Sequence, residues 1–501
     1  MAKAGELLKK EMHTFVENDQ SIAFDVVDLN VWLMSNVERD VLEAIDGRTT
    51  KNAIVEQLRE RYPANEVEAA IETWRARGVL VNYELPPASV QEDCLDVQTF
   101  MTLNVAQVCN LRCKYCFAHA GTYDQPAMMS REVARASVDM LMRLSGKEKH
   151  CSILFFGGEP MLNMNTISYT IEYAHEQAKA HGKVVEFLMV TNGTLLTPQN
   201  IDYLVRQRVR VEISIDGPAE FHDRYRVFAD GHGSYTQVVA GARALCERSR
   251  WPVAANATLT SHRTSLKEIV AHFESLGFAT SGVKMYMPNE KLQGVPSSAD
   301  LTIQDITTLQ KECREYVYDL VARNEFNPAF SNIFGFRTFV QSLSGSWRRT
   351  CNCGVGRYLI SVSATGDVYP CYGLIDAKND FYRMGNVLNN SLNFELLENI
   401  RLAANVENRR DCRYCWGRYL CAGGTHCFAY QQQGSVVTAE SNWGGDCSFT
   451  QRIMELAIYA FAVWRERDPR LFRTLRHYPI TFYLSRAAAD SVSKDEVTLN
   501  G

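Results

Sequence analysis

The chain has 501 residues, of which 46% are hydrophobic and 22% charged, and its formal net charge is −5. This composition is ordinary for a globular protein and excludes disordered, collagen-like and coiled-coil chains. Because 53 basic residues are balanced by 58 acidic ones, nothing points to binding of nucleic acid or of an anionic membrane. No apolar run approaches the ~20 residues that span a bilayer, and the N-terminus lacks a secretory h-region, so we expect a cytoplasmic protein.

Residues 1–88 are expected to form a first unit. Three strand-like runs are followed by three amphipathic helical patterns, and Gly78 ends the last helix. A small β-hairpin with three helices indicates a module of winged-helix type, and the Leu-Pro-Pro at 85–87 is its expected linker. The strand-like runs lie at 13–16, 22–27 and 31–34.

The next unit, residues 95–320, alternates strand-like runs with amphipathic helices. Six such repeats predict an α/β fold with a parallel sheet and outer helices, a partial (β/α)6 barrel of TIM type. Functional sites in such barrels lie at the C-terminal ends of the strands. The strand-like runs lie at 101–105, 153–156, 184–191, 209–215, 253–259 and 283–287.

Three further segments complete the chain. Residues 300–345 have a helical, connecting pattern, whereas residues 345–450 are rich in Cys, Gly and Trp and have little helical periodicity. We expect metal rather than apolar burial to organise this cysteine-rich domain. Residues 451–501 are predicted to form a helical extension that ends in a frayed polar tail.

The 15 cysteines are unevenly distributed. In a reducing cytosol, clustered cysteines indicate metal ligands rather than disulfides. Three lie between residues 109 and 116, and eight more lie between residues 351 and 447. The isolated ones are interpreted as buried small hydrophobic residues: Cys94, Cys151, Cys246 and Cys313.

The first cluster, Cys109, Cys113 and Cys116, has the form C-x3-C-x2-C and follows the first barrel strand directly. Three thiolates on an iron–sulfur cube leave one iron with an open position, where chemistry can occur. A zinc site is the alternative. The motif resembles that of the radical SAM enzymes. The resemblance implies that S-adenosylmethionine (SAM) chelates the open iron and that one electron then cleaves it to a 5′-deoxyadenosyl radical.

Polar motifs that resemble those of the same superfamily follow the next three strands. Taken singly, the Gly-Gly-Glu-Pro at 157–160 could be a turn, and the Ser-Ile-Asp-Gly at 214–217 a strand exit. The resemblance implies a set of SAM contacts: Gly157, Gly158 and Glu159 at the amino group, Asn192 at the ribose or methionine, Ser214 and Arg226 at the carboxylate, Asp216 as a polar orienter and Tyr115 near the adenine.

The eight cysteines between residues 351 and 447, called here the second cysteine field, resemble those of the SPASM domain. That domain carries two auxiliary [4Fe–4S] clusters, so three clusters are implied in all. The resemblance assigns Cys412, Cys415, Cys421 and Cys447 to the distal cluster, and Cys351, Cys353, Cys371 and Cys427 to the nearer one. The chain departs from the pattern where Thr425 occupies the usual cysteine position. This departure leaves the nearer cluster's fourth ligand open, and an open iron could bind a substrate thiolate. A zinc ribbon is the alternative.

The first unit resembles the PqqD-like recognition element of enzymes that mature ribosomally made peptides. The resemblance implies that its edge strand binds an extended leader peptide by β-augmentation. The alternative is a structural or dimerising winged helix. DNA binding is disfavoured because the segment has no basic stripe.

The order of the three expected domains resembles that of radical SAM/SPASM maturases that form thioether cross-links. Examples are the maturases of sactipeptides, of ranthipeptides and of the quinohemoprotein amine dehydrogenase small subunit. The implied partners are a Cys-bearing precursor peptide or small protein subunit, and an external electron donor such as flavodoxin or ferredoxin. Carbon–carbon cross-linking and formylglycine formation are alternative reactions, although a leader-binding module speaks against the latter. A non-catalytic electron-transfer scaffold is the alternative of another class.

Overall fold

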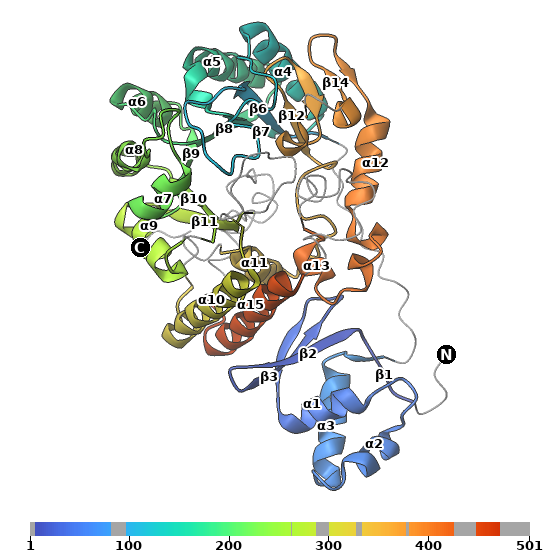
Figure 1. Cartoon of the computed structure of the whole chain (residues 1–501). Coiled ribbons are helices and arrows are strands. Elements are labelled where there is room, and N and C mark those ends of the chain that lie inside the picture. The colour runs from blue at the N-terminus through green and yellow to red at the C-terminus, as the bar shows by residue number, and fades with distance from the viewer. Residues whose placement is uncertain are drawn as a thin grey trace, which may run out of the picture.

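The computed structural model describes residues 6–81, 97–261, 263–286, 300–326, 333–376, 380–424 and 447–470. Figure 1 shows the N-terminal unit at one end of a larger α/β body. In these ranges, no helix has the length and apolar character needed to cross a membrane. The predicted linker at 85–87, Cys94, Cys427 and the C-terminal tail lie outside the described residues.

Six parallel strands form the body of the molecule, and each pairs with its neighbour in the sequence. This arrangement confirms the predicted partial TIM-type barrel. The strands are β6 (Phe100–Ala106), β7 (His150–Gly157), β8 (Val184–Thr191), β9 (Arg210–Ser214), β10 (Ala254–Leu259) and β11 (Thr280–Met285). Between them lie α4 (Arg131–Leu144), α5 (Met164–Ala180), α6 (Pro198–Arg206), α7 (Ala219–Tyr225), α8 (Tyr235–Arg248) and α9 (Leu266–Ser275).

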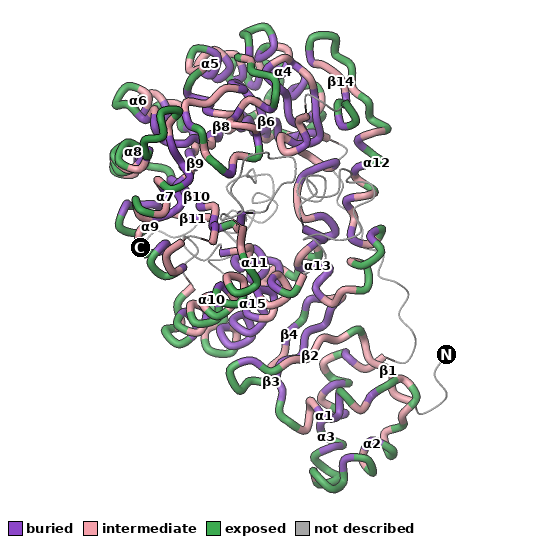
Figure 2. Tube along the Cα trace, viewed as in Figure 1, coloured by how far each residue is buried: buried purple, intermediate pink, exposed green. Residues whose placement is uncertain are grey.

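The barrel strands are buried on both faces, as parallel strands usually are. In β6, Met101 and Leu103 belong to the main core with α4 and α5, whereas Phe100 belongs to a smaller inner cluster with Leu154 and Phe156. This alternation follows from the two-residue period of a strand. Figure 2 shows the strands largely buried and the outer helices α6 and α8 partly exposed.

The cysteine-rich segment extends the barrel sheet, which the sequence did not predict. Strand β12 (Leu359–Val362) lies parallel to β6, and β13 (Asp367–Tyr369), β14 (Gly385–Asn386) and β15 (Ser391–Leu392) follow it antiparallel. The run in β12 is only four residues long, and the open edge of β6 supplies its pairing.

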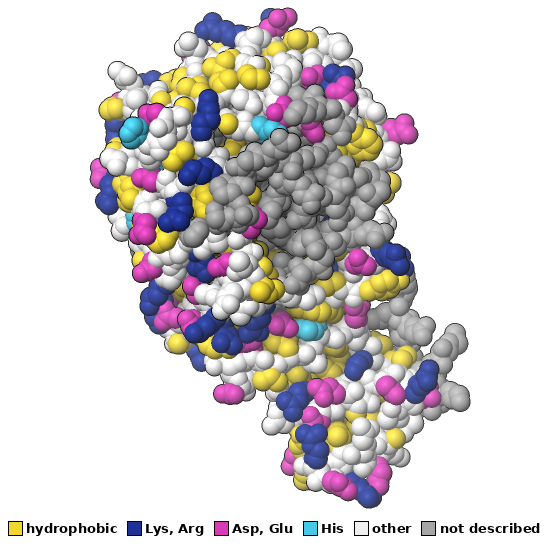
Figure 3. All heavy atoms as spheres, in the orientation of Figure 1, with side chains coloured by type: hydrophobic (Ala, Val, Ile, Leu, Met, Phe, Trp, Pro, Cys, Tyr) yellow, Lys and Arg dark blue, Asp and Glu magenta, His cyan; other side chains and the backbone are white. Residues whose placement is uncertain are grey.

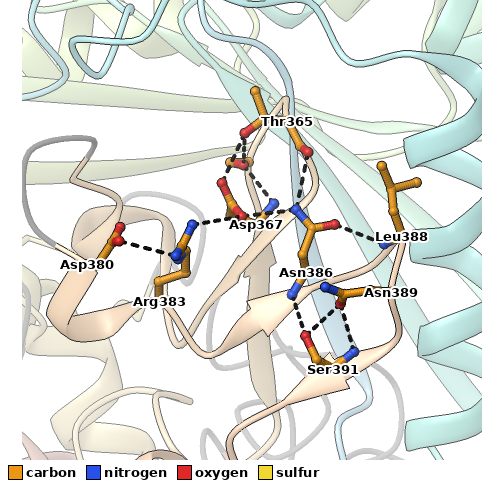
Figure 4. A network of polar contacts seen from close by, with 9 residues as sticks. Thr365, Asp367, Asp380, Arg383, Asn386, Leu388, Asn389 and Ser391 are labelled. Carbon is orange, nitrogen blue, oxygen red and sulfur yellow. Dashed lines mark hydrogen bonds and ion pairs between the residues drawn. The ribbon is translucent and has the colours of Figure 1, made fainter.

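A polar network holds the hairpins of this extension together (Figure 4). The side chain of Asn386 donates to Asp367 over 2.9 Å, and its backbone N–H donates to the Ser391 hydroxyl over 3.2 Å. Arg383 joins Asp367 to Asp380 through ion pairs of 3.7 and 3.1 Å. The extension is therefore held by local polar contacts as well as by its pairing with the barrel.

The N-terminal unit contains the predicted three-stranded sheet and three helices. The turn residues Asn18 and Asp19 both have positive φ, as a type I′ hairpin turn requires. A two-residue pairing between β1 and β5 was too short to predict. The elements are β1 (Leu8–Lys9), β2 (Met12–Glu17), β3 (Gln20–Asp25), β4 (Val31–Met34), α1 (Asn36–Ala44), α2 (Lys51–Leu58), α3 (Ala64–Ala76) and β5 (Leu80–Val81).

The long helix α15 (Ser448–Arg467) joins the N-terminal sheet to the body of the molecule. One face of the sheet, with Ile22 and Phe24, belongs to the same core as α15, while Ala23 on the other face packs with α1–α3. Helices α10 (Ile303–Arg323) and α11 (Phe336–Gly345) pack on α15 from the barrel side. Helix α12 (Phe394–Ala404) and the short α13 (Arg418–Cys421) lie in the cysteine-rich segment.

Candidate functional site

The predicted site residues lie at the C-terminal ends of four neighbouring strands. Cys109 follows β6, Glu159 follows β7, Asn192 follows β8, and Ser214 is the last residue of β9. Because parallel strands end at the same edge of a sheet, these residues face one region of the barrel. On the molecular face in Figure 3, acidic and basic side chains are interspersed.

The three cysteines after β6 interact with one another. The Cys113 thiol has charge interactions with both Cys109 and Cys116. Burial raises the pKa of Cys113 to about 12 and that of Cys109 to about 11, and a neighbouring carboxylate, Glu159, adds to the effect at Cys109. Thiols in such a setting bind as thiolates only when a cation compensates their charge. This donor set fits an iron–sulfur cluster.

Backbone N–H groups surround the third cysteine. Burial raises the pKa of Cys116, while hydrogen bonds from the backbone of Ala118, Gly121 and Ala120 oppose that rise. The loop after the motif therefore folds around the sulfur and directs partial positive charge toward it. Such a nest of donors suits a sulfur that carries negative charge.

Two glycines, Gly157 at the end of β7 and Gly158 after it, allow the backbone to approach the cysteine loop closely. A Cβ on Gly157 would lie 2.3 Å from the carbonyl oxygen of Ala106, and one on Gly158 would lie 2.3 Å from that of Val108. A Cβ on Gly121 would lie 2.7 Å from the Cβ of Cys109. Only glycine fits these positions, which explains why glycines occupy them.

Glu159 is fully buried, and its carboxylate is occupied by the protein. It accepts hydrogen bonds from the N–H of Met161 (3.0 Å), the hydroxyl of Thr191 (2.7 Å) and the N–H of Asn192 (2.8 Å). Burial raises its pKa to about 7, although these hydrogen bonds oppose the shift. In this structure Glu159 thus anchors the end of β8, whereas the sequence suggested a contact with the SAM amino group.

Asn192 connects the end of β8 to the cysteine loop. Its amide nitrogen donates to the side chain of Asn110 over 2.9 Å and lies 3.7 Å from the sulfur of Cys109. Its oxygen accepts from the N–H of Thr194 over 2.9 Å, and Asn110 also donates to the Thr194 hydroxyl over 2.8 Å. Sequence reasoning missed Asn110 and Thr194, although both stand beside motif residues.

Asp216 and Arg226 form a buried ion pair. The guanidinium donates through Nε (2.9 Å) and Nη2 (3.1 Å) to the two carboxylate oxygens. The carboxylate also accepts from the N–H of Thr258 (2.9 Å) and from the hydroxyl of Tyr115, and Arg226 lies 5.3 Å from the Tyr115 ring centroid. The sequence suggested that Arg226 binds the SAM carboxylate and that Tyr115 packs near the adenine. In this structure both contact Asp216.

The buried His222 contacts the backbone of Asp216 directly and that of Arg226 through Ser234. Its Nδ1 accepts from the N–H of Asp216 (3.4 Å), and its Nε2 lies 3.0 Å from the hydroxyl of Ser234, which donates its own proton to the carbonyl of Arg226 over 2.8 Å. These contacts require a neutral imidazole protonated at Nε2. Burial lowers the pKa of His222 to about 4, in agreement with that state.

The cysteines assigned to the distal cluster gather beside α13 and α15. The thiol of Cys421 has charge interactions with Cys447 and Cys412, and burial raises its pKa to about 11. The sulfur of Cys415 accepts from the N–H of Gly417 (3.4 Å) and lies 3.7 Å from the amide nitrogen of Gln451 in α15. The helix therefore reaches the distal group directly.

The cysteines assigned to the nearer cluster also lie close to Arg349. Cys371 and Cys353 pack in one small apolar cluster, and Cys351 is buried two residues earlier. Arg349 has charge interactions with both Cys421 and Cys353 and donates to the carbonyl of Asn352 over 2.8 Å. Arg349 therefore lies near a cysteine of each proposed set, and the assignment of ligands to two clusters stays a prediction.

The N-terminal sheet contacts the loop that carries the distal cysteines. Glu11 forms a bidentate ion pair with Arg418, with distances of 2.6 and 2.5 Å. The His13 ring stacks on Trp416 with centroids 3.8 Å apart and planes at 2°, and it lies 3.1 Å from Glu455 of α15. The sheet therefore belongs to the support of the second cysteine field.

Two parts of the chain match known domain families. Residues 103–276 match the model of the radical SAM superfamily, and residues 351–416 match the SPASM iron–sulfur cluster-binding domain. The cyclopropyl synthase TigE of Paramaledivibacter caminithermalis is 24% identical over 54% of this chain, and the match spans 57% of TigE, somewhat more than half of its length. A cysteine-type anaerobic sulfatase-maturating enzyme of Clostridium perfringens is 26% identical over 63% of this chain and 85% of its own.

A solved structure, anSMEcpe with bound AdoMet and Cp18Cys peptide, has the same fold, with a TM-score of 0.59 at 20% identity, over 76% of this chain and 100% of its own. The three half-buried thiols that interact with one another, and the glycines that allow close backbone approach beside them, fit the cofactors of these domains. The chain therefore carries a radical SAM domain of TIM-like α/β fold and a C-terminal SPASM domain, which imply SAM and [4Fe–4S] clusters as its cofactors.

Proposed function

We propose that this protein is a radical SAM peptide maturase that joins a Cys sulfur of a precursor peptide to a carbon of another residue. Bound SAM at a reduced cluster supplies a radical that abstracts hydrogen. In the proposed reaction the acceptor carbon gives up a hydrogen atom and the thiol gives up a proton. A carbon–sulfur bond forms, and the remaining electron leaves through an auxiliary cluster.

The proposal gives each part of the described site a role. Cys109, Cys113 and Cys116 hold the SAM-binding cluster, and Asn192 and Glu159 fix the loop around it. The site residues predicted to contact SAM are Tyr115, Gly157, Gly158, Glu159, Asn192, Ser214, Asp216 and Arg226. The two cysteine groups beside Arg349 hold two auxiliary clusters, with Cys427 as a further proposed ligand.

The observation that carries the peptide assignment is the N-terminal sheet with its open edges. Its strand order is β2-β3-β4, so β2 and β4 each pair on one side only. In antiparallel pairing, every second residue of an edge strand points its backbone groups away from the neighbouring strand. On β2 these residues are Thr14 and Val16, whose N–H and C=O have no backbone partner among the described residues. On β4 the N–H of Leu33 is likewise without one there. An extended leader peptide can add to such an edge.

Proline scanning tests this docking mode. Proline at an outward-facing N–H is tolerated in an edge strand, but it removes the donor that an added strand needs. Thr14→Pro or Leu33→Pro is expected to weaken leader binding at least tenfold, as measured by fluorescence anisotropy of a labelled leader. The matched Thr14→Ala and Leu33→Ala variants keep the N–H and are expected to bind normally. Equal binding by the proline and alanine variants of both strands would refute strand addition.

The decisive experiment is mass analysis of a modified peptide. The chain is co-expressed with a Cys-bearing precursor, from a small open reading frame beside its gene, and with a flavodoxin or ferredoxin as electron donor. A thioether lowers the peptide mass by two hydrogens and leaves one thiol fewer to alkylate. A carbon–carbon link lowers the mass equally but keeps every thiol, and that result would overturn the thioether.

Formylglycine formation is the second candidate, because the C. perfringens relative that matches over 85% of its length is named as a sulfatase-maturating enzyme. It predicts a carbonyl in place of a Cys or Ser side chain and a reaction that does not need the leader edge. A scaffold without turnover predicts no 5′-deoxyadenosine when the reduced protein meets SAM.

A further inference from the structure

Tyr123 carries a buried hydroxyl that no group in the described part of the chain satisfies. The residue is 4% exposed, and its hydroxyl has no hydrogen-bond partner among the residues that the structure describes. An unsatisfied buried hydroxyl costs about 1–3 kcal/mol. A bound cofactor that accepts a hydrogen bond at this place would remove that cost.

The backbone around Tyr123 is bent to hold the ring in place. Tyr123 has a φ of 52°, and His119 and Ala120, earlier in the same loop, have φ values of 50° and 57°. Left-handed conformations at non-glycine residues cost about 1–3 kcal/mol each and cluster at functional sites. The N–H of Tyr123 donates to the carbonyl of Ala118 over 2.9 Å, which closes the loop that folds around Cys116.

The ring of Tyr123 lies between the first cysteine cluster and the nearer auxiliary group. It contacts Phe117 edge-on with centroids 6.0 Å apart, and Phe117 lies 6.3 Å from Tyr372. Phe117 directly follows Cys116, and Tyr372 directly follows Cys371. The Tyr123 side chain has charge interactions with both of these cysteines.

We propose that the Tyr123 hydroxyl donates a hydrogen bond to a sulfur of the SAM-binding cluster at its Cys116 corner, on the side that faces Cys371. A phenol is a proton donor at neutral pH, and hydrogen bonds to cluster sulfurs are among the factors that set reduction potentials. Because reduction adds negative charge to the sulfurs, this bond stabilises the reduced cluster more than the oxidised one. Tyr123 is therefore a positioning residue that makes the SAM-binding cluster easier to reduce, whatever peptide the enzyme modifies.

Potentiometry tests the proposal without a peptide substrate. The full-length chain is reconstituted anaerobically, and the potentials of its clusters are followed by EPR. In Tyr123→Phe, the reduced fraction of the SAM-binding cluster at a fixed potential is expected to fall about tenfold, a shift of about 59 mV to more negative values. The auxiliary clusters are expected to keep their potentials. Tyr173→Phe is the matched control, because its hydroxyl bonds Asp139 on the outer helices over 2.6 Å.

A second measurement applies even if the phenylalanine variant loads its clusters poorly. Site-specific 3-fluorotyrosine at position 123 keeps the ring and makes the hydroxyl a stronger donor. The potential of the SAM-binding cluster is then expected to move in the positive direction. Unchanged potentials in the fluorinated protein, or a shift confined to an auxiliary cluster, would overturn the assignment. Failure of peptide modification would not bear on it, since no peptide is present.

Discussion

The two cysteine fields are supported in different ways. The first, at 109–116, lies on the barrel, and its supports come from the ends of adjacent strands, such as Gly158 after β7 and Asn192 after β8. The second depends on contacts between distant parts of the chain, such as the ion pair of Glu11 with Arg418. A regular sheet fixes the first field, whereas docking of separate elements fixes the second.

This difference implies that the two fields can be damaged separately. A change in a barrel loop is expected to disable SAM cleavage and leave the second field loaded. A change at the interface of the N-terminal sheet, α13 and α15 is expected to do the reverse. The predictions below test that separation, beginning with the largest effect.

Removal of a ligand from the first field gives the largest expected effect. Cys113→Ala leaves two thiols at the SAM-binding cluster, so we expect at least a thousandfold loss of 5′-deoxyadenosine formation, assayed by chromatography with dithionite as reductant. Iron content and EPR are expected to show the auxiliary clusters retained. The conservative Cys313→Ala change, at a buried cysteine of α10 outside both fields, is the control. Undiminished 5′-deoxyadenosine in Cys113→Ala would contradict the assignment of the first field.

Removal of a ligand from the second field is expected to uncouple the reaction instead. Cys421 interacts with Cys412 and Cys447, so Cys421→Ala should lose the distal cluster. We expect 5′-deoxyadenosine formation within about threefold of the wild type and cross-linked peptide reduced at least a hundredfold, because the spare electron loses its exit. Mass spectrometry and chromatography of the same reaction measure both. Parallel loss of both products would show that the fields are not separable.

A change at the docking contact is expected to act on the second field through the fold. Glu11→Gln removes a carboxylate that pairs with the largely buried Arg418. We expect a loss of about 1–3 kcal/mol from this interface and weaker retention of the distal cluster on mild heating, followed by its EPR signal. Glu56→Gln, at an exposed i,i+3 pair in α2, is the control and should change nothing. Faster loss of the SAM-binding cluster instead would reverse the proposed division.

A larger residue at Gly158 tests whether the first cysteine field needs the close backbone packing beside it. A Cβ on Gly158 would meet a backbone oxygen at 2.3 Å, so Gly158→Ala must shift the β7 end or the cysteine loop. We expect at least tenfold weaker SAM binding by equilibrium dialysis on the reconstituted protein. In Gly282→Ala the new Cβ would have no neighbour closer than 3.8 Å, and wild-type binding is expected. Equal SAM binding by the two variants would show that the close backbone packing at Gly158 is not needed.

The sequence predicted the first field better than the second for the same physical reason. Strand periodicity places Cys109, Glu159, Asn192 and Ser214 at one edge of a sheet, so their proximity follows from the fold. What it could not predict is which polar groups satisfy one another. The bond of Arg226 to Asp216, for example, depends on side-chain geometry that no spacing encodes.

In the second field the sequence predicted the cysteines but not their framework. The four residues of β12 carry too little periodicity to be recognised, and they become a strand only because β6 offers an open edge. The stacking of His13 on Trp416 joins residues some 400 positions apart, and no local pattern indicates it. The PqqD-like character of the N-terminal unit and the thioether type of the reaction stay predictions.

The last expected effect is absent at neutral pH and appears only in acid, at the buried His222 beside Asp216. His222 is neutral behind Asp216, and burial lowers its pKa from 6.5 to about 4, so the unfolded chain binds the proton more readily than the folded one. Its contribution is therefore complete above about pH 6.5 and is lost as the pH falls toward 4, by at most about 3 kcal/mol. His222→Gln should flatten this part of the curve of denaturation midpoint against pH, whereas His232→Gln, at an exposed histidine, should not. An unchanged acid slope in His222→Gln would mean that this histidine is not the group that titrates.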